Sequence, residues 1–306
     1  MATKLRIGGL LDVEQPLDRI VAQLQRFEEA GFAHAFASQI FGPDALTLLA
    51  VAGSQVPRIE VGTGVVPVYP RHPMMLAQQA LTVQAATDDR LLLGIGLSHQ
   101  VVVEGMWGMS FDKPYSYMKE YLSALMPLLR GETVSFAGER ITSNAFQPVG
   151  MKGAAAPPVL VAALGTAMLK LAGTVADGTI TWMTGTDTVA SHIVPSIRAA
   201  AESAGRPEPR VMVSLPVVVT ADREGCAERI NAALAIYPNL PSYKAMLDKE
   251  GAQSPADVSF IGDEETVAAS IEKLAASGAT DFVAANAGNR EEQARTLALL
   301  SELARA

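Results

Sequence analysis

The chain has 306 residues, of which 49% are apolar and 18% charged, so it can bury a substantial core and is not a disordered chain. Its 24 basic and 32 acidic side chains give a formal charge of −8, and no basic run offsets it, which argues against a nucleic-acid partner. The single cysteine, Cys226, excludes an internal disulfide framework and a multi-cysteine metal site.

The chain passes at once into a strand-like run, LRIGGLL (5–11). Its start lacks the basic region and apolar stretch of a secretory leader. No apolar run approaches the roughly 20 residues that cross a bilayer. We therefore expect a cytoplasmic protein without a membrane partner.

Strand-like runs and helical periodicity alternate through the first half of the chain. Pro16 opens a helix after the first strand, and further strands are predicted at 34–38, 59–66 and 90–96. The run 90–96 is almost entirely apolar, which is typical of a parallel strand buried on both faces. Its helix is predicted only after a long loop, at 115–129.

The second half continues the alternation after a Gly- and Pro-rich insertion. Four more strands are predicted, at 158–164, 178–183, 210–220 and 280–285. A helix at 222–236 and a helical excursion from Tyr243 to Glu250 precede the last helix and strand. Eight alternations predict an α/β fold, a (β/α)8 TIM barrel with insertions after strands 4 and 7, as one domain over residues 1–306.

In such a barrel the functional site lies at the carboxyl ends of the strands. The third strand ends in VGTGVVPVYPRHP, where glycines and prolines break the strand and suggest a bulge against which a planar ligand rests. A loop that only leads to Pro73 explains this run about as well. The fourth strand ends with Gly96, Ser98 and His99, although His99 can equally be a solvated loop histidine.

A phosphate needs free backbone N–H groups, and two helix starts offer them. One is at Gly165 and Thr166 after the fifth strand, where an ordinary threonine cap is the competing interpretation. The other is at Gly288 and Asn289, which open the last helix.

Other chemistries lack a pattern in this chain. The four histidines show no metal-ligand spacing, so no metal site is predicted. No Gly-x-Ser-x-Gly elbow indicates a hydrolase. Asp44 and Glu104 do not form an evident catalytic pair, and surface roles are expected for both.

Together these stretches resemble the luciferase-like, F420-dependent oxidoreductase family. The resemblance rests on VGTGVVPVYPRHP with the following QQALTVQAATDDRLLLGIGLSH, and it extends through AGFAHAFASQ, ALGTAMLKLAGTVADGTITWM and FIGDEETVAASIEKLAASGATDFVAA. It covers nearly the whole chain, least well in the middle insertion and at 238–257. It implies a cofactor ring at the barrel mouth and a non-proline cis peptide in the third strand, at Gly64–Val65 or, one residue back, at Thr63–Gly64.

The resemblance also implies the site residues. Those expected beside the cofactor ring and its side chain are Ser38, Thr63, Gly64, Val65, Gly96, Ser98 and His99, and those expected beside its phosphate are Leu164, Gly165 and Thr166. The candidates for moving a proton are Gln39, His99 and Glu104, and the candidates for contacting substrate are Tyr69 and Trp107. Some relatives present an acidic or histidine pair where this chain has Ser38 and Gln39, so the acid/base assignment stays open.

The implied reaction is hydride transfer between the deazaflavin coenzyme F420 and a small organic substrate such as an enone, imine or alcohol. Two alternatives stay open: an FMN-dependent monooxygenase of the same superfamily, and a noncatalytic barrel that binds a cofactor. A homodimer is expected from the resemblance alone.

Overall fold

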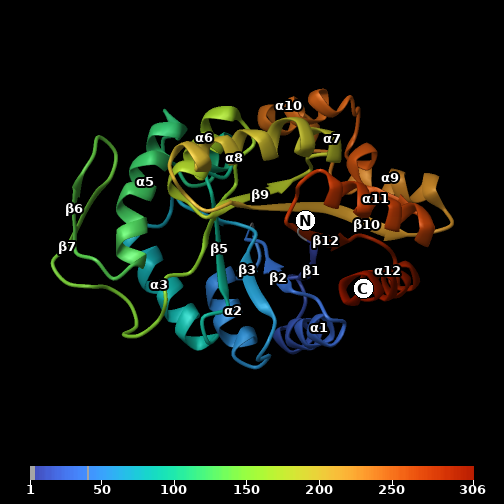
Figure 1. Ribbon diagram of the computed structural model, residues 1–306, viewed down its shortest axis with the longest axis horizontal. Coiled ribbons are helices and arrows are strands. Elements are labelled where there is room, and N and C mark those ends of the chain that lie inside the picture. Colours follow the sequence, from blue (N-terminus) through green and yellow to red (C-terminus); the bar gives the residue numbers. More distant parts are fainter. Residues whose placement is uncertain (1–3, 40) are drawn as a thin grey trace.

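Eight parallel strands close into a barrel in the computed structural model, which describes residues 4–39 and 41–306 (Figure 1). The strands neighbour one another in chain order, and the last pairs with the first, so the predicted (β/α)8 barrel is confirmed. The barrel strands are β1 (Arg6–Leu10), β2 (His34–Ala37), β3 (Glu60–Thr63), β5 (Leu91–Gly96), β8 (Val159–Val161), β9 (Gly178–Trp182), β10 (Arg210–Val219) and β12 (Asp281–Asn286).

Helices surround the barrel and connect successive strands (Figure 1). The helices that follow barrel strands are α1 (Leu17–Glu29), α2 (Ala45–Gly53), α3 (Pro73–Ala86), α5 (Pro114–Leu129), α6 (Thr166–Val175), α7 (Thr186–Thr188) continued by η1 (Val189–Ile193) and α8 (Val194–Ser203), α11 (Glu264–Ala276) and α12 (Arg290–Arg305). Within residues 4–39 and 41–306, no helix combines the length and the apolar character that crossing a membrane requires.

The predicted insertions after the fourth and seventh barrel strands are both present. The first adds α4 (Gln100–Gly105) before α5 and an antiparallel hairpin, β6 (Val134–Ala137) with β7 (Thr142–Ala145), which lies beside α5 (Figure 1). The second adds α9 (Arg223–Ala233), η2 (Tyr237–Asn239), α10 (Pro241–Glu250), η3 (Pro255–Val258) and β11 (Phe260–Gly262). Strand β11 extends the sheet by pairing with the end of β10.

Side chains fill the barrel interior, so it is a packed core and not a channel. Glycine at position 62 is required by this packing, because a Cβ there would lie 2.4 Å from the Phe36 ring. A short strand, β4 (Val66–Pro67), continues the third barrel strand and pairs with β5. The interior layer consists of Phe36, Leu92, Leu160, Ile180, Met212 and Val283.

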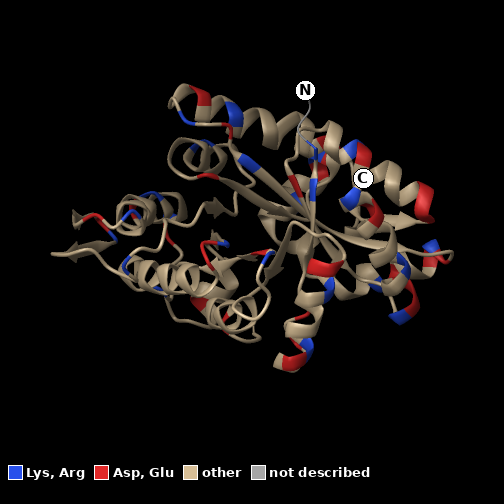
Figure 2. Cartoon of the chain, turned by 60° about the horizontal axis from the view of Figure 1, so that its bottom comes forward, with Lys and Arg blue, Asp and Glu red and all other residues tan. Residues whose placement is uncertain are grey.

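A charged network closes the amino end of the barrel, where each member is the first residue of its strand. The Asp281 carboxylate lies 2.6 Å from the Arg210 guanidinium and 3.3 Å from His34 Nε2, and Arg6 and Arg210 both reach Glu60. Burial alone would raise the pKa of Asp281, but the neighbouring His34 and the hydrogen bonds from Arg210 hold it well below its usual value. Elsewhere, charges of both signs are interspersed over the outer helices (Figure 2).

Candidate active site

The mouth of the barrel, at the carboxyl ends of the strands, has an apolar floor. Three half-buried side chains lie on the interior layer and form this floor: Leu10, Val65 and Ala162. Leu10 is the last residue of β1, Val65 follows β3 and Ala162 follows β8, so the floor spans the barrel opening.

Gly64 lies at the same floor and is not required there by packing. A Cβ added to Gly64 would lie 3.5 Å from Phe36 Cδ1 and 3.7 Å from Ile180 Cδ1, which is ordinary contact. The peptide bond between Gly64 and Val65 is cis, and the bond between Thr63 and Gly64 is not. A floor of small and apolar groups, with no side chain at Gly64, fits a planar ring.

Two residues that we expected beside the cofactor have packing roles in the structure. The Thr63 side chain is fully buried, and its hydroxyl donates to the Gly94 carbonyl at 2.7 Å. Gly96 is buried as well, and a Cβ there would lie 2.7 Å from Val65 Cγ2. The glycine at 96 therefore makes room for Val65 of the third strand, and its expected place beside the cofactor ring stays a prediction.

The fourth barrel strand turns sharply into α4 at Ser98 and His99. Ser98 has a left-handed backbone with φ 62°, and both side chains are half-buried. Burial lowers the pKa of the His99 imidazole, so the ring is neutral at pH 7. The structure thus places a neutral histidine at the mouth.

An aromatic wall stands over one side of the mouth and comprises His99, Trp182, Tyr237 and Tyr243. The rings contact in sequence: Trp182 and Tyr237 have centroids 6.1 Å apart, Tyr237 and Tyr243 4.8 Å, and Tyr243 and His99 5.8 Å. The two tyrosines belong to η2 and α10, which we call the covering segment (residues 237–250). Trp182, Tyr237 and Tyr243 were not predicted as site residues. For the two tyrosines, the sequence signal was an aromatic pair in the proline-rich stretch YPNLPSY.

Glu250 anchors the end of the covering segment to the helix after the sixth barrel strand. Its carboxylate accepts hydrogen bonds from the backbone N–H groups of Asp187 at 3.0 Å and Thr188 at 2.6 Å. Gly185 makes room for it, because a Cβ there would lie 2.2 Å from Glu250 Cδ. The covering segment is therefore held in place over the mouth.

A pocket of about 430 Å³ adjoins the end of the third barrel strand, and Gln39 and Trp107 both line it. Gln39 Oε1 accepts a hydrogen bond from the Ala45 backbone N–H at 3.1 Å. Arg71, the cation of the pocket, forms an ion pair with Asp44, which also caps α2. The remaining lining residues are Pro67, Pro70 and Gln79.

Two other candidate residues have local structural contacts. Tyr69 exposes 4% of its surface and stacks on Tyr117 with ring centroids 4.2 Å apart. Burial, reinforced by Tyr117, raises the pKa of Tyr69 to about 12. The exposed Glu104 carboxylate accepts from Gln100 Nε2 at 2.9 Å and from the Phe111 N–H at 3.3 Å, so it stabilises the loop around α4. Of Gln39, His99 and Glu104, only His99 belongs to the aromatic wall.

The two helix starts considered for phosphate differ in structure. At α6, Gly165 is the N-cap, no side chain among the described residues caps the helix, and a Cβ at Gly165 would meet nothing within 4 Å. At α12, Asn289 accepts from the N–H groups of Glu291 and Glu292 at 3.0 and 3.1 Å, and Glu292 bonds back to Asn289. The start of α6 is open to an anion, whereas that of α12 is closed by its own side chains.

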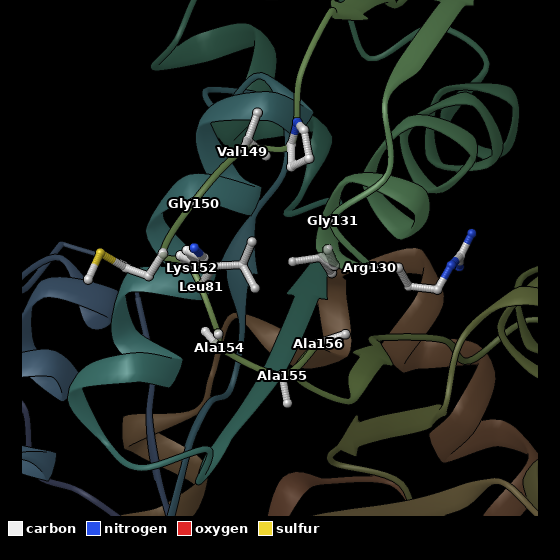
Figure 3. Close-up of a pocket in the computed structure, with 13 residues that line it drawn as sticks. Leu81, Arg130, Gly131, Val149, Gly150, Lys152, Ala154, Ala155 and Ala156 are labelled. Atoms are coloured by element: carbon white, nitrogen blue, oxygen red, sulfur yellow. The ribbon is translucent and has the colours of Figure 1, made fainter.

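A larger cavity of about 710 Å³ lies away from the mouth (Figure 3). It is bounded by Leu81 of α3, the end of α5 and the segment 148–156 that leads into β8, which places it toward the amino ends of the strands. Arg130 points away from the cavity in Figure 3 and pairs with Glu132 at 2.6 Å. Its other lining residues are mainly glycine, alanine, proline and aliphatic residues, with Lys152 as a further cation.

Comparisons with known proteins identify relatives over most of the chain. A family model described as luciferase-like monooxygenase matches residues 1–303. A putative coenzyme F420-dependent oxidoreductase of Mycobacterium tuberculosis is 30% identical over 236 residues, 69% of this chain and 65% of that protein. An F420-dependent glucose-6-phosphate dehydrogenase of Nakamurella multipartita is 28% identical over 254 residues, 78% of this chain and 72% of that protein.

Solved structures share the fold. The coenzyme F420-dependent tetrahydromethanopterin reductase from Methanopyrus kandleri matches with a TM-score of 0.78 at 20% identity, covering 98% of both chains. The oxygenating constituent of 3,6-diketocamphane monooxygenase from Pseudomonas putida, in complex with FMN, matches with a TM-score of 0.77 at 16% identity, covering 99% of this chain and 98% of that chain. At these identities the likeness concerns the barrel architecture.

Proposed function

The chain belongs to the luciferase-like monooxygenase family, and on this premise we propose that it is an oxidoreductase that transfers a hydride between coenzyme F420 and a small organic substrate. The observation that carries the proposal is the apolar floor of the mouth, where Leu10, Val65 and Ala162 lie half-buried on the interior layer and Gly64 presents no side chain. The two curated relatives described above, both named as F420-dependent, favour this coenzyme over FMN.

The proposal assigns a role to each open part of the mouth. The ring would lie on the floor at Gly64 and Val65, with the hydroxyls of Ser38 and Ser98 available to its polar edge. The cofactor phosphate would bind at Leu164–Thr166, where the free N–H groups and the positive end of the α6 dipole favour an anion. His192 Nε2 lies 2.8 Å from the Leu164 carbonyl oxygen, and this hydrogen bond helps to fix the loop.

When bound, the coenzyme supplies or accepts a hydride, and the protein has to place the substrate carbon and handle one proton. His99 is the imidazole of the aromatic wall and is neutral at pH 7. A neutral imidazole can accept the proton of an alcohol that is oxidised and so become an imidazolium; in the reverse direction the imidazolium, formed by taking a proton from solvent, gives that proton to the oxygen of the carbonyl that is reduced. The amide of Gln39 has no proton to exchange in this range, so its proposed role is to orient the substrate.

Titration of the purified protein with F420 and with FMN, followed by fluorescence under anaerobic conditions, tests the proposal. We expect saturable F420 binding that is about tenfold tighter than FMN binding, equivalent to about 1.4 kcal/mol. We also expect reduced F420 to be oxidised by at least one compound in a panel of enones, imines and quinones. Tight FMN binding without F420 binding would favour the monooxygenase alternative, and F420 binding without turnover on a broad panel would favour the noncatalytic barrel.

The expected homodimer and the cytoplasmic location stay predictions. Light scattering during size-exclusion chromatography measures the oligomeric state directly, and a mass equal to one 32.2 kDa chain would contradict the dimer.

A further inference from the structure

The aromatic wall carries no charge at neutral pH. Burial lowers the pKa of His99 and raises the pKa values of Tyr237 and Tyr243, so the imidazole is unprotonated and both phenols are protonated. Trp182, the fourth member, is uncharged at every pH. A ligand that contacts this wall therefore meets ring faces and neutral polar edges only.

The rim around the mouth is also apolar. Exposed hydrophobic side chains come from the loops after the second, fourth and seventh barrel strands, and each exposes 57% of its surface or more. Apolar side chains that converge from several loops on one opening offer apolar contact to a ligand that enters there. These residues are Phe41, Val101, Met106 and Ile236.

One lysine of the covering segment and the arginine of the adjoining pocket are each paired with a carboxylate. In the covering segment, Lys244 Nζ lies 2.7 Å from the Asp248 carboxylate. In the adjoining pocket, the guanidinium of Arg71 forms an ion pair with Asp44. A phosphorylated or carboxylated substrate needs an available cation, and desolvating an unpaired anion against aromatic rings is costly.

On the premise of the proposed function, we propose that the substrate is an uncharged, ring-bearing ketone, enone or alcohol whose ring packs against the aromatic wall. Tyr243 is the central contact, since its ring touches those of both His99 and Tyr237. The proposal separates this chain from the relative named for glucose 6-phosphate, whose substrate carries a phosphate. The same wall leaves His99 beside the substrate oxygen.

Binding of acetophenone, an uncharged aryl ketone, tests the inference without coenzyme. The chain has two tryptophans, so a Trp107→Phe background leaves Trp182 of the aromatic wall as the fluorophore. We expect saturable quenching of Trp182, with a Kd about tenfold lower than that of benzoate, its charged counterpart, or of glucose 6-phosphate. Equal or tighter binding of either anion would overturn the inference.

Three substitutions locate the binding. Tyr243→Ala should raise the acetophenone Kd about tenfold, because it removes the central ring, while Tyr243→Phe should keep it within about twofold because the ring face remains. Tyr115→Ala is the control, since Tyr115 is exposed on α5 and lies outside the wall. An effect of Tyr115→Ala equal to that of Tyr243→Ala, or a loss with Tyr243→Phe as large as with alanine, would contradict binding at the ring face.

Titration of the same protein with F420 separates the two proposals. If F420 binds and acetophenone does not, the substrate class is wrong while the proposed function stands. If acetophenone binds at the wall and F420 does not, the proposed function fails on its own evidence.

Discussion

Replacing Gly64 with valine tests whether the floor of the mouth is kept open for a ligand. The new Cβ would lie 3.5 Å from Phe36 Cδ1 and 3.7 Å from Ile180 Cδ1, which real Cβ atoms commonly show. Because the packing already has room, we expect the free energy of unfolding to change by about 1 kcal/mol or less. The two methyl groups would stand on the floor where the ring is proposed to rest, so the Kd for F420 should rise about tenfold or more.

Gly94→Ala is the matched control, because it is a glycine of the neighbouring strand that packing does require. Its Cβ would lie 1.9 Å from the Thr63 carbonyl oxygen, a backbone atom that cannot move aside without disturbing the third strand. Overpacking of this kind costs about 1–3 kcal/mol or more. We therefore expect Gly64→Val to weaken F420 binding with little loss of stability, and Gly94→Ala to lower the free energy of unfolding.

Urea unfolding of the protein without coenzyme measures the first quantity, and fluorescence titration with F420 measures the second. The reasoning is refuted if Gly64→Val lowers the free energy of unfolding as much as Gly94→Ala does. It is equally refuted if Gly64→Val binds F420 as tightly as the parent protein.

Three further substitutions probe other parts of the structure. Gly165→Asp places a carboxylate at the open start of α6; thermal stability should stay equal or rise by a few tenths of a kcal/mol, F420 affinity measured by titration should fall, and unchanged affinity would contradict a phosphate there. Burial lowers the pKa of His99, so its contribution to stability is complete above its ordinary value of 6.5 and is lost as the pH falls below it; His99→Asn should flatten this dependence in urea unfolding measured across that range, and an unaltered slope would count against it. Asp281→Asn leaves His34 and Arg210 without their shared carboxylate, which should lower the free energy of unfolding by about 3–5 kcal/mol; F420 affinity of the folded protein should not change, because the network lies at the opposite end of the barrel.

The barrel could be predicted because each βα unit carries its own local signals. The apolar run 90–96 lies within one residue of β5, and Pro73 and Asp44 open or cap the predicted helices. The hairpin of β6 and β7 was not predicted, since its strands are short, partly polar and exposed. Strand β11 was not predicted either, because three apolar residues become a strand only through pairing with the distant end of β10.

Only part of the site could be predicted from the sequence. Gly64 and Val65 lie at the mouth, and their contact with a cofactor stays a prediction. A glycine that makes room for a neighbouring strand, such as Gly96, cannot be told from one that makes room for a ligand until the packing is known. The aromatic wall was not predicted, for a different reason. Trp182 and Tyr243 are far apart in the chain, and only the return of the covering segment over the mouth brings them near His99.

A crystal structure of the protein soaked with F420 tests the central claim most directly. The account predicts the ring on the floor at Gly64 and Val65, the phosphate at the start of α6, and the reactive edge of the ring open toward the aromatic wall. A coenzyme bound in the cavity between α3 and α5, or a phosphate held at Asn289, would contradict it.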